Sequence, residues 1–420
     1  MTDGAGGAGG GGWRRRWAGS AWLVRALLVS LFLQTAVHSV RPMVSYEALD
    51  LGATPGQLGA IAACFGVLSL AGAIPVGRCV DRWGPGPFLV LGAVTVTLVA
   101  VLLVTARSLV LLGVATMLLG LGHILATVAL QTLLANRGGS ERRDERFAAL
   151  TVAVSLGQLA GPALGGLLAG AGGGDAAGSS VGTMAVFGVG AVMALVSGAF
   201  ATTLLRSSRP GARTGTAGDD GAGERPRFSL WHIMRLPHMP QAMLASVAVL
   251  TSIDVLVAYL PLYGQSHGLS VRTVGFLLAA LAAGSLTSRF CMRLLIRGVG
   301  RGRLLALSAA VPAVVLAVFP LLDHVPVLFA AMVIAGLGLG LGQPLSLAWV
   351  ASSAPRELRG TALGVRLSGN RLGQIVVPAV VGAFAGVTGI AAVFWCLAAM
   401  LASSAALNAR ASFEDKEPTA

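Results

Sequence analysis

The chain alternates between long apolar runs and short polar breaks along almost its whole length. Twelve runs reach the roughly 20 residues that a helix needs to cross the hydrocarbon core of a bilayer. They cover residues 21–45, 56–76, 87–106, 108–134, 147–170, 181–205, 240–264, 271–295, 303–322, 326–353, 360–385 and 387–408. Glycine and proline interrupt many runs, as is common in membrane helices. The pattern predicts an all-α integral membrane protein with twelve spanning helices.

The two halves of the chain repeat each other at an offset of 216 residues. The Leu-Gly-Gln of residues 156–158 falls on that of residues 372–374, and Pro162 falls on Pro378, with no gap. Internal repeats built of long apolar segments are typical of membrane transporters whose substrate site lies between two related halves. We therefore expect two six-helix bundles with a central site.

Polar segments divide the chain. Residues between the sixth and seventh runs are rich in Ser, Arg, Pro, Gly and Thr and predict a flexible cytoplasmic linker. The expected parts are a disordered cytoplasmic amino end (1–20), an N-terminal bundle (21–205), the linker (206–236), a C-terminal bundle (237–409) and a cytoplasmic tail (410–420). The arginines at 14–16 also fit a secretory or twin-arginine signal, but eleven further apolar runs favour an amino end that leads into the first spanning helix.

Composition indicates that lipid is the solvent. Hydrophobic residues make up 55% of the 420 residues and charged residues 11%, with a mean hydropathy of +0.79. The formal charge of +13 would favour nucleic acid in a soluble protein, but here most basic residues lie in short segments on one side of the apolar runs, with Arg107 and Arg272 on the other. The positive-inside rule predicts a multi-pass protein of the inner or plasma membrane with both termini cytoplasmic, and no nucleic-acid partner.

Nothing in the sequence indicates metal, nucleotide or enzyme chemistry. Cys64, Cys79, Cys291 and Cys396 lie in or beside apolar runs without metal-ligand spacing, so we interpret them as packing residues. The alternating glycines of residues 336–342 have no preceding strand, and no G-x-x-x-x-G-K motif follows, which excludes an ATP-driven pump as far as this chain goes. Because no nucleophile and base stand together, we expect no enzyme, no cofactor and no metal.

Two motifs follow known patterns. The segment after the second run reads G-x-x-x-D-R-x-G at Gly77, Asp81, Arg82 and Gly84. The fifth run reads G-x-x-x-G-P-x-x-G-G at Gly157, Gly161, Pro162, Gly165 and Gly166. With the tenth and eleventh runs, these motifs resemble the major facilitator superfamily over the chain from Trp22 to about Asn408.

The resemblance implies transport by alternating access, a gating role for Asp81 and, from the glycine-proline motif, export. The chain departs from the pattern because Gly84-Pro85-Gly86-Pro87 stands where basic residues are expected, and Arg297 occupies the repeat position of Asp81.

Each motif has a second interpretation. Asp81 would latch the halves by pairing with a nearby arginine or with one entering the eleventh helix, such as Arg359 or Arg366. The alternative is a solvated loop whose surface ion pair is worth less than about 1 kcal/mol. Helix packing explains the glycines of the fifth run as well as a role specific to antiport does.

Charges inside the apolar runs are the candidate transport residues, because each costs about 2.5–3.5 kcal/mol at the membrane centre. Asp254 is the only carboxylate well inside a predicted span, and its repeat partner is His38. Burial favours the neutral form of a carboxyl group, and histidine titrates near neutral pH, so either could carry a coupled proton. The alternatives are an Asp254 paired with a buried arginine and a His38 that is only a packing residue.

The remaining candidates are mostly cationic. Arg41 lies one turn after His38 and would meet substrate, close the outer gate or snorkel to the interface. Arg366 and Asn370 share a face of the eleventh helix, with Arg371 adjacent. Other candidates for the cavity are Gln34, His123, Arg289 and Gln343, of which His123 and Arg289 fit a structural role better. Arginines outnumber acids inside the apolar runs. This excess favours a substrate with an anionic group, or a site in which the arginines pair with the proton-binding acid.

These observations predict a proton-coupled secondary transporter that exports small amphipathic molecules, with the protein a monomer in the bilayer. Two alternatives remain: proton-linked uptake of an organic anion, and a membrane sensor on the same fold that does not transport.

Overall fold

The computed structural model describes residues 11–137, 143–171, 180–205, 239–353 and 359–414. The predicted linker 206–236 lies outside the described residues, as do parts of the two predicted ends. Within the described part of the chain, all regular secondary structure is helical, and twelve helices are long and apolar enough to cross a membrane. The predicted fold class is confirmed.

Six of these helices precede the linker and six follow it. The first six are α1 (Gly11–Asp50), α2 (Pro55–Trp83), α3 (Pro85–Val104), α4 (Leu109–Asn136), α5 (Arg143–Gly170) and α6 (Ser180–Leu205). The second six are α8 (Met239–Ser266), α9 (Val271–Val299), α10 (Arg301–Val318), α11 (Val325–Ser353), α12 (Arg359–Thr388) and α13 (Ala391–Glu414), with the short 3-10 helix η2 (Phe319–Leu321) after α10.

Several helices extend beyond the apolar runs. The motif that begins at Gly77, predicted as a loop, forms the last turns of α2 as far as Trp83. The turn itself is Gly84, whose φ of +82° suits a residue without a side chain, and Pro85 then begins α3. Helix α1 already begins at Gly11, inside the predicted disordered end. A helix does not have to stop where its side chains become polar, so apolar length alone misplaces these ends.

The internal repeat is visible in individual bonds. Ser69 of α2 donates to the backbone oxygen of Gly120 of α4 at 2.9 Å, and its repeat partner Ser285 of α9 donates to that of Gly336 of α11 at 3.1 Å. In both pairs the glycine lies so close to the facing helix that a Cβ atom would collide with its backbone. The two halves therefore share one packing scheme as well as one sequence pattern.

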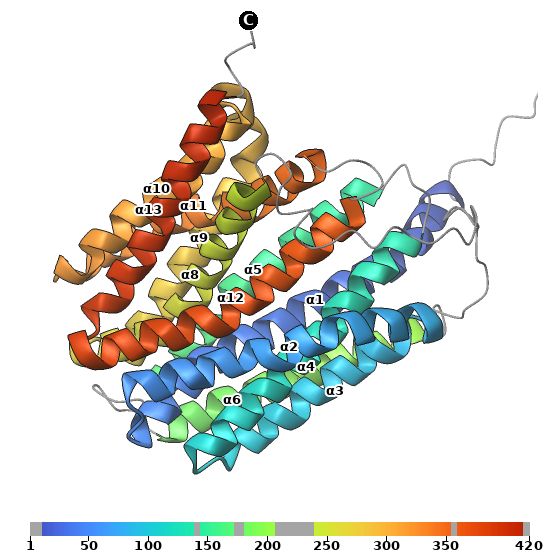
Figure 1. Cartoon of the computed structure of the whole chain (residues 1–420). Coiled ribbons are helices and arrows are strands. Elements are labelled where there is room, and N and C mark those ends of the chain that lie inside the picture. Colours follow the sequence, from blue (N-terminus) through green and yellow to red (C-terminus); the bar gives the residue numbers. More distant parts are fainter. Residues whose placement is uncertain (1–10, 138–142, 172–179, 206–238, 354–358, 415–420) are drawn as a thin grey trace, which may run out of the picture.

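The halves meet mainly through α2 against α12 and α5 against α9. We call the end where α1 and α8 begin the termini end, and the end where they finish the far end. Gly59 of α2 lies against the backbone oxygen of Pro378, and its repeat partner Gly275 of α9 lies against that of Pro162. These contacts lie toward the far end, and Figure 1 shows the ribbons of the two halves converging there and diverging toward the termini end.

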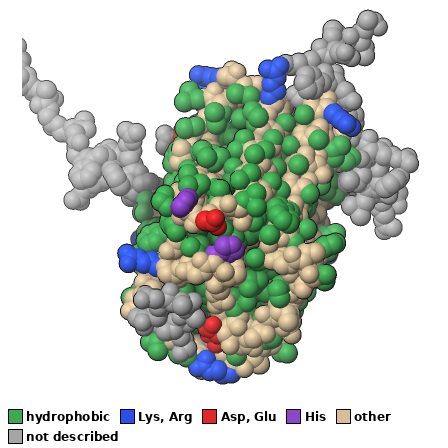
Figure 2. All heavy atoms as spheres, turned by 90° about the vertical axis from the view of Figure 1, so that its left-hand side faces the viewer, with side chains coloured by type: hydrophobic (Ala, Val, Ile, Leu, Met, Phe, Trp, Pro, Cys, Tyr) green, Lys and Arg blue, Asp and Glu red, His purple; other side chains and the backbone are tan. Residues whose placement is uncertain are grey.

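The outside of the bundle is apolar. Large hydrophobic side chains that are more than 60% exposed occur on helices of both halves, among them Leu98, Val110, Leu195, Leu294 and Val387. Figure 2, which views the left-hand side of Figure 1, shows hydrophobic side chains over most of the visible face and few charged ones. Exposed apolar surface of this extent suits lipid rather than water.

Candidate functional site

An ion pair joins the two halves at mid-depth. Arg41 of α1 donates from Nη1 to Oδ1 of Asp254 on α8 at 2.6 Å, across 213 residues of sequence. Both side chains are largely buried, with exposed fractions of 12% and 9%. The sequence predicted both residues as candidates but left the partner of Asp254 open, and it expected His38 to share its cavity. The structure gives Asp254 the arginine partner that was the alternative interpretation.

The second carboxylate oxygen of Asp254 faces α12. Gln374 donates from Nε2 to Oδ2 of Asp254 at 2.5 Å, and Arg371 donates from Nη1 to Oε1 of Gln374 at 2.8 Å. Asp254 therefore holds α1 of one half and α12 of its own half at the same time. Gln374 was absent from the predicted site, although it continues the stripe of Arg366 and Asn370 at a spacing of four residues.

A series of contacts leads from Arg41 through aromatic side chains to an amide. Its guanidinium lies 4.3 Å from the ring centroid of Phe65 on α2, and that ring lies 5.7 Å from the ring of His123 on α4. His123 Nε2 is 3.2 Å from Oε1 of Gln34, while His123 Nδ1 is buried and has no hydrogen-bond partner among the described residues. His123 and Gln34 were both predicted candidates, and the structure brings them together; Phe65 carries no charge and was missed.

His38 bonds within its own helix. Its Nδ1 donates to the backbone oxygen of Gln34, one turn earlier in α1, at 2.9 Å. No side-chain bond from His38 to Asp254 is formed, because Arg41 takes that place. The proton-carrying role predicted for His38 remains a prediction, and its geometry here is that of the packing alternative.

A second polar network lies in the C-terminal half. Arg366 donates from Nη2 to the backbone oxygen of Gln343 at 3.0 Å, to its Oε1 at 2.8 Å and to Ser346 Oγ at 3.0 Å. Asn370 contacts the same Oε1 at 3.5 Å and accepts from Ser246 of α8 at 2.8 Å. The predicted residues Arg366, Asn370 and Gln343 therefore form one cluster, which ties α8, α11 and α12 together without an acid.

Arg289 makes a further bond between the halves. It donates from Nη1 to Ser155 Oγ of α5 at 2.6 Å and from Nε to the backbone oxygen of Gly340 at 3.2 Å. Glu47, the other buried carboxylate among the described residues, lies 3.4 Å from Arg107 instead of meeting a central arginine. Of these two buried carboxylates, Asp254 is therefore the one that pairs with an arginine at the middle of the bundle.

The glycine motif of α5 serves close packing. A Cβ on Gly157 would collide with Gln34, and one on Gly161 with His38, both on α1. Gly166 faces Gly275 of α9, so Pro162 and this glycine border the other half. Gly165 lies against Ser39 of α1 at ordinary packing distance. The contacts are those of the packing interpretation, and an antiport-specific role stays a prediction.

The predicted latch is not closed in this structure. Asp81 is exposed and, among the described residues, forms no ion pair, while Arg366 is engaged with Gln343 and Ser346. The side chain of Arg359 lies outside the described part of the chain. Arg82 extends over the ring of Trp83 at 5.5 Å. The pairing fails here because Asp81 lies at the termini end, where the two halves diverge.

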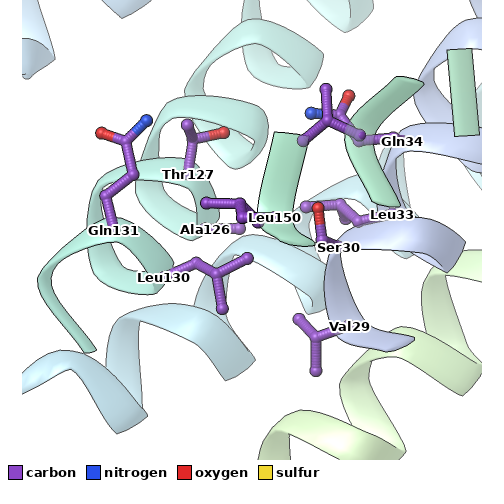
Figure 3. Close-up of a pocket in the computed structure, with 10 residues that line it drawn as sticks. Val29, Ser30, Leu33, Gln34, Ala126, Thr127, Leu130, Gln131 and Leu150 are labelled. Carbon is purple, nitrogen blue, oxygen red and sulfur yellow. The ribbon is translucent and has the colours of Figure 1, made fainter. Parts of the chain in front are cut away.

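A pocket opens beside this charged centre, in the N-terminal half. Its cavity volume is only about 40 Å³, and about 340 Å³ when the space open to solvent is included. Its walls come from α1, α4 and α5, as Figure 3 shows. The lining residues are Val29, Ser30, Leu33, Gln34, Ala126, Thr127, Leu130, Gln131, Leu150 and Val154. Gln34 belongs both to this pocket and to the contact with His123.

The sequence matches a known family over most of its length. Residues 26–365 and 293–420 match the profile of the Major Facilitator Superfamily. The chain belongs to the major facilitator superfamily. The resemblance that the motifs suggested is therefore confirmed, and the chain is a multi-pass membrane protein of the secondary transporter kind.

Relatives within the superfamily differ in what they carry. Multidrug resistance protein MdtG of Klebsiella pneumoniae (strain 342) is 28% identical over 147 residues, which are 34% of this chain and 36% of MdtG. The match thus spans about a third of that relative. Solved structures of a D-xylose-proton symporter and of the nucleoside transporter NupG give TM-scores of 0.73 and 0.70 at 17% and 14% identity. They cover 93% and 94% of this chain, and 96% and 100% of theirs, and show the fold alone.

Proposed function

We propose that this protein is a proton-coupled transporter that exports small amphipathic molecules by alternating access, with Asp254 as the proton carrier. The observation that supports it is the position of that carboxylate, which bonds to Arg41 of one half and to Gln374 of the other at mid-depth. A proton that binds there acts directly on the contact between the parts that must move. Export is favoured by the α5 motif and by the similarity to MdtG.

The coupling follows from the ion pair. While Asp254 is ionised, it holds Arg41 and so joins α1 to α8. Protonation removes the negative charge and leaves the largely buried guanidinium of Arg41 without its counter-ion. Breaking a buried pair by removing one partner costs about 3–5 kcal/mol. The arrangement of the halves that keeps these two groups together is therefore favoured only in the ionised state.

The orientation and conformational state follow from two features. The positive-inside pattern supports an orientation with the termini end on the cytoplasmic side of a cell membrane. In that orientation, the close contacts of Gly59 with Pro378 and of Gly275 with Pro162 lie on the outer side, and the divergence of the halves toward the termini end supports a state open inward. From that state an exporter would take up its substrate.

A second candidate, uptake of an organic anion with a proton, is favoured by the charge balance. Arg41, Arg289, Arg366 and Arg371 lie half-buried or buried around one central acid, Asp254. In this scheme the proton neutralises Asp254, and the freed Arg41 binds the anion. Proton and anion would then travel in the same direction.

The test uses everted membrane vesicles with an imposed pH gradient, a pH-sensitive dye and a panel of cationic, neutral and anionic amphipathic compounds. We compare the natural protein with Asp254→Asn and with a matched control, Asp323→Asn, which removes an exposed carboxylate outside the spans. Export predicts that some compound dissipates the gradient with the natural protein and the control but not with Asp254→Asn.

Two outcomes redirect the proposal. If Asp254→Asn keeps the full rate and pH dependence, Asp254 is not the proton carrier. If no compound acts in everted vesicles but organic anions enter right-side-out vesicles together with protons, uptake replaces export as the function.

A further inference from the structure

A buried tyrosine joins the two halves at the far end. Tyr259 of α8 is 0% exposed, and its hydroxyl group donates to the backbone oxygen of Pro55 on α2 at 3.0 Å and to that of Pro378 on α12 at 3.3 Å. Pro55 belongs to the N-terminal half, whereas Pro378 belongs to the same half as Tyr259. A hydroxyl group has one hydrogen to donate, so this hydrogen is shared between an acceptor in the opposite half and one in its own.

Two glycines make room for this hydroxyl group. A Cβ atom on Gly59 of α2, or on Gly382 of α12, would collide with the hydroxyl oxygen of Tyr259. The glycines belong to opposite halves, so the phenol group fills the point where α2, α8 and α12 meet. Its contact with Pro55 therefore lasts only while α2 stays against α12 and α8.

The internal repeat supplies a comparison within the molecule. The related crossing of α5 with α9 has glycines at the repeat positions, Gly166 and Gly275, and is equally close. The repeat partner of Tyr259 is Met43 of α1, which is buried but has no hydroxyl group. Because that crossing is closed without a donor at this position, close packing of the halves does not require one. The hydroxyl group of Tyr259 has a use that packing does not explain.

Two acceptors allow the bond to be exchanged. If α2 moves away from α12, the hydroxyl group loses Pro55 but can turn fully to Pro378, which moves with it. Opening therefore avoids the cost of leaving a buried donor unpaired. The contact favours the closed arrangement by no more than one hydrogen bond, which keeps the change reversible.

Tyr259 and Asp254 lie on the same helix, and both bond to the opposite half. They are five residues apart, which is about 7.5 Å along a helix axis. Asp254 holds Arg41 of α1 at mid-depth, and Tyr259 holds Pro55 of α2 at the far end. A shift of α8 at the ion pair therefore acts on the far-end contact through about one and a half turns of helix.

We propose that Tyr259 is a positioning residue that holds the far end closed, by a hydrogen bond that passes from Pro55 to Pro378 when the halves separate there. The inference goes beyond the proposed function. It requires that the halves exchange between two arrangements, and it requires neither proton coupling nor export. Its failure would leave those two proposals as they stand.

The test measures how often the far end opens in the purified full-length protein in nanodiscs. A single cysteine replaces Ala63 in a background without the four natural cysteines. Ala63 is 6% exposed and lies between Gly59 and Gly66 on the face of α2 that contacts α12. A water-soluble maleimide reaches this cysteine when α2 leaves α12, so the labelling rate reports the population of the open arrangement, even a small one.

Two variants are compared in this background. Tyr259→Phe removes the hydroxyl group and leaves the ring. The matched control is Tyr263→Phe, one turn later in α8 and equally buried, whose hydroxyl group donates to the backbone oxygen of Leu322 in its own half at 3.4 Å. Loss of one hydrogen bond between the halves should make labelling about three- to ten-fold faster in Tyr259→Phe. The control should label at the rate of the background protein.

Three results would overturn the proposal. Labelling that is no faster in Tyr259→Phe would mean that its hydroxyl group does not hold the far end closed. Equal acceleration in both phenylalanine variants would mean that α8 is loosened in general. Labelling of the background protein as fast as that of the denatured protein would mean that α2 and α12 are not closed in solution.

Discussion

At the scale of single residues, the chemistry concentrates in the contact between Arg41 and Asp254. Two opposite charges in a poorly hydrated region stabilise the protein little beyond an uncharged pair, but either one alone is costly. The contact is therefore better understood as a switch than as a source of stability.

This asymmetry predicts the result of a double-mutant cycle. Arg41→Gln and Asp254→Asn should each destabilise the purified protein by about 3–5 kcal/mol, since each leaves one buried charge unpaired. The double variant should be more stable than the sum of the single effects predicts, because both charges are gone. Thermal unfolding in detergent measures the three variants. Strictly additive losses would mean that the two side chains do not interact.

The residues of this contact were predicted better than the contact itself. Asp254 and Arg41 are conspicuous in sequence because a charge in an apolar run is costly wherever it lies. Their pairing depends on how α1 packs against α8, which no local pattern encodes. Phe65 was missed because a phenyl ring is common in membrane helices and gives no signal on its own, whereas Gln374 had a signal, its spacing of four residues from Asn370, that was not used.

At the scale of helices, close contact between the halves depends on small residues in repeat-related places. Gly59 and Gly275 both face a proline carbonyl of the opposite half. A side chain at either position would force the facing helices apart.

We predict that Gly59→Ala shifts the protein toward a state that is open at the far end. Spin labels at the exposed positions 50 and 323, in a background without the four natural cysteines, would report longer distances by pulsed electron resonance. The matched control is Gly188→Ala, whose new Cβ atom meets nothing within 4 Å and should leave the distances unchanged. Unchanged distances in Gly59→Ala would show that this contact does not set the closed state.

Helix positions were predictable, whereas helix ends were not. Apolar length is a local property and located all twelve spans. The polar continuation of α2 from Gly77 to Trp83 is also helical, and only Gly84, with its positive φ, stops it. The internal repeat gave a sign of this turn, because Gly300 is the repeat partner of Gly84. In the structure Gly300 likewise ends α9 before α10, with a φ of +87°.

At the scale of the whole molecule, charge predicts how the protein sits in the membrane. With the termini end in the cytoplasm, a cysteine at position 267 faces outward and one at position 83 faces inward. In the background without the four natural cysteines, a membrane-impermeant maleimide applied to intact cells should label His267→Cys and not Trp83→Cys, and permeabilised cells should show both. The reverse pattern would invert the proposed topology and make the sealed side the inner one.

Charge at the centre also predicts which ligands compete for the site. Arg41, Arg289 and Arg371 around mid-depth, with Arg366 nearer the termini end, outnumber the one central aspartate and leave a positive field. A positive field in poorly hydrated surroundings opposes permanent cations. Three isosteres of one amphipathic compound, bearing a hydroxyl group, a carboxylate and a quaternary ammonium group, separate the possibilities in a competition assay. We expect the ammonium compound to compete about ten-fold less well than the neutral one.

A carboxylate that competes best, and better still at low pH, would favour proton-linked anion uptake, because protonated Asp254 releases Arg41. An ammonium compound that competes best would mean that Asp254 leaves Arg41 for the substrate, and the ion pair would then be the binding site of a cation instead of the proton switch.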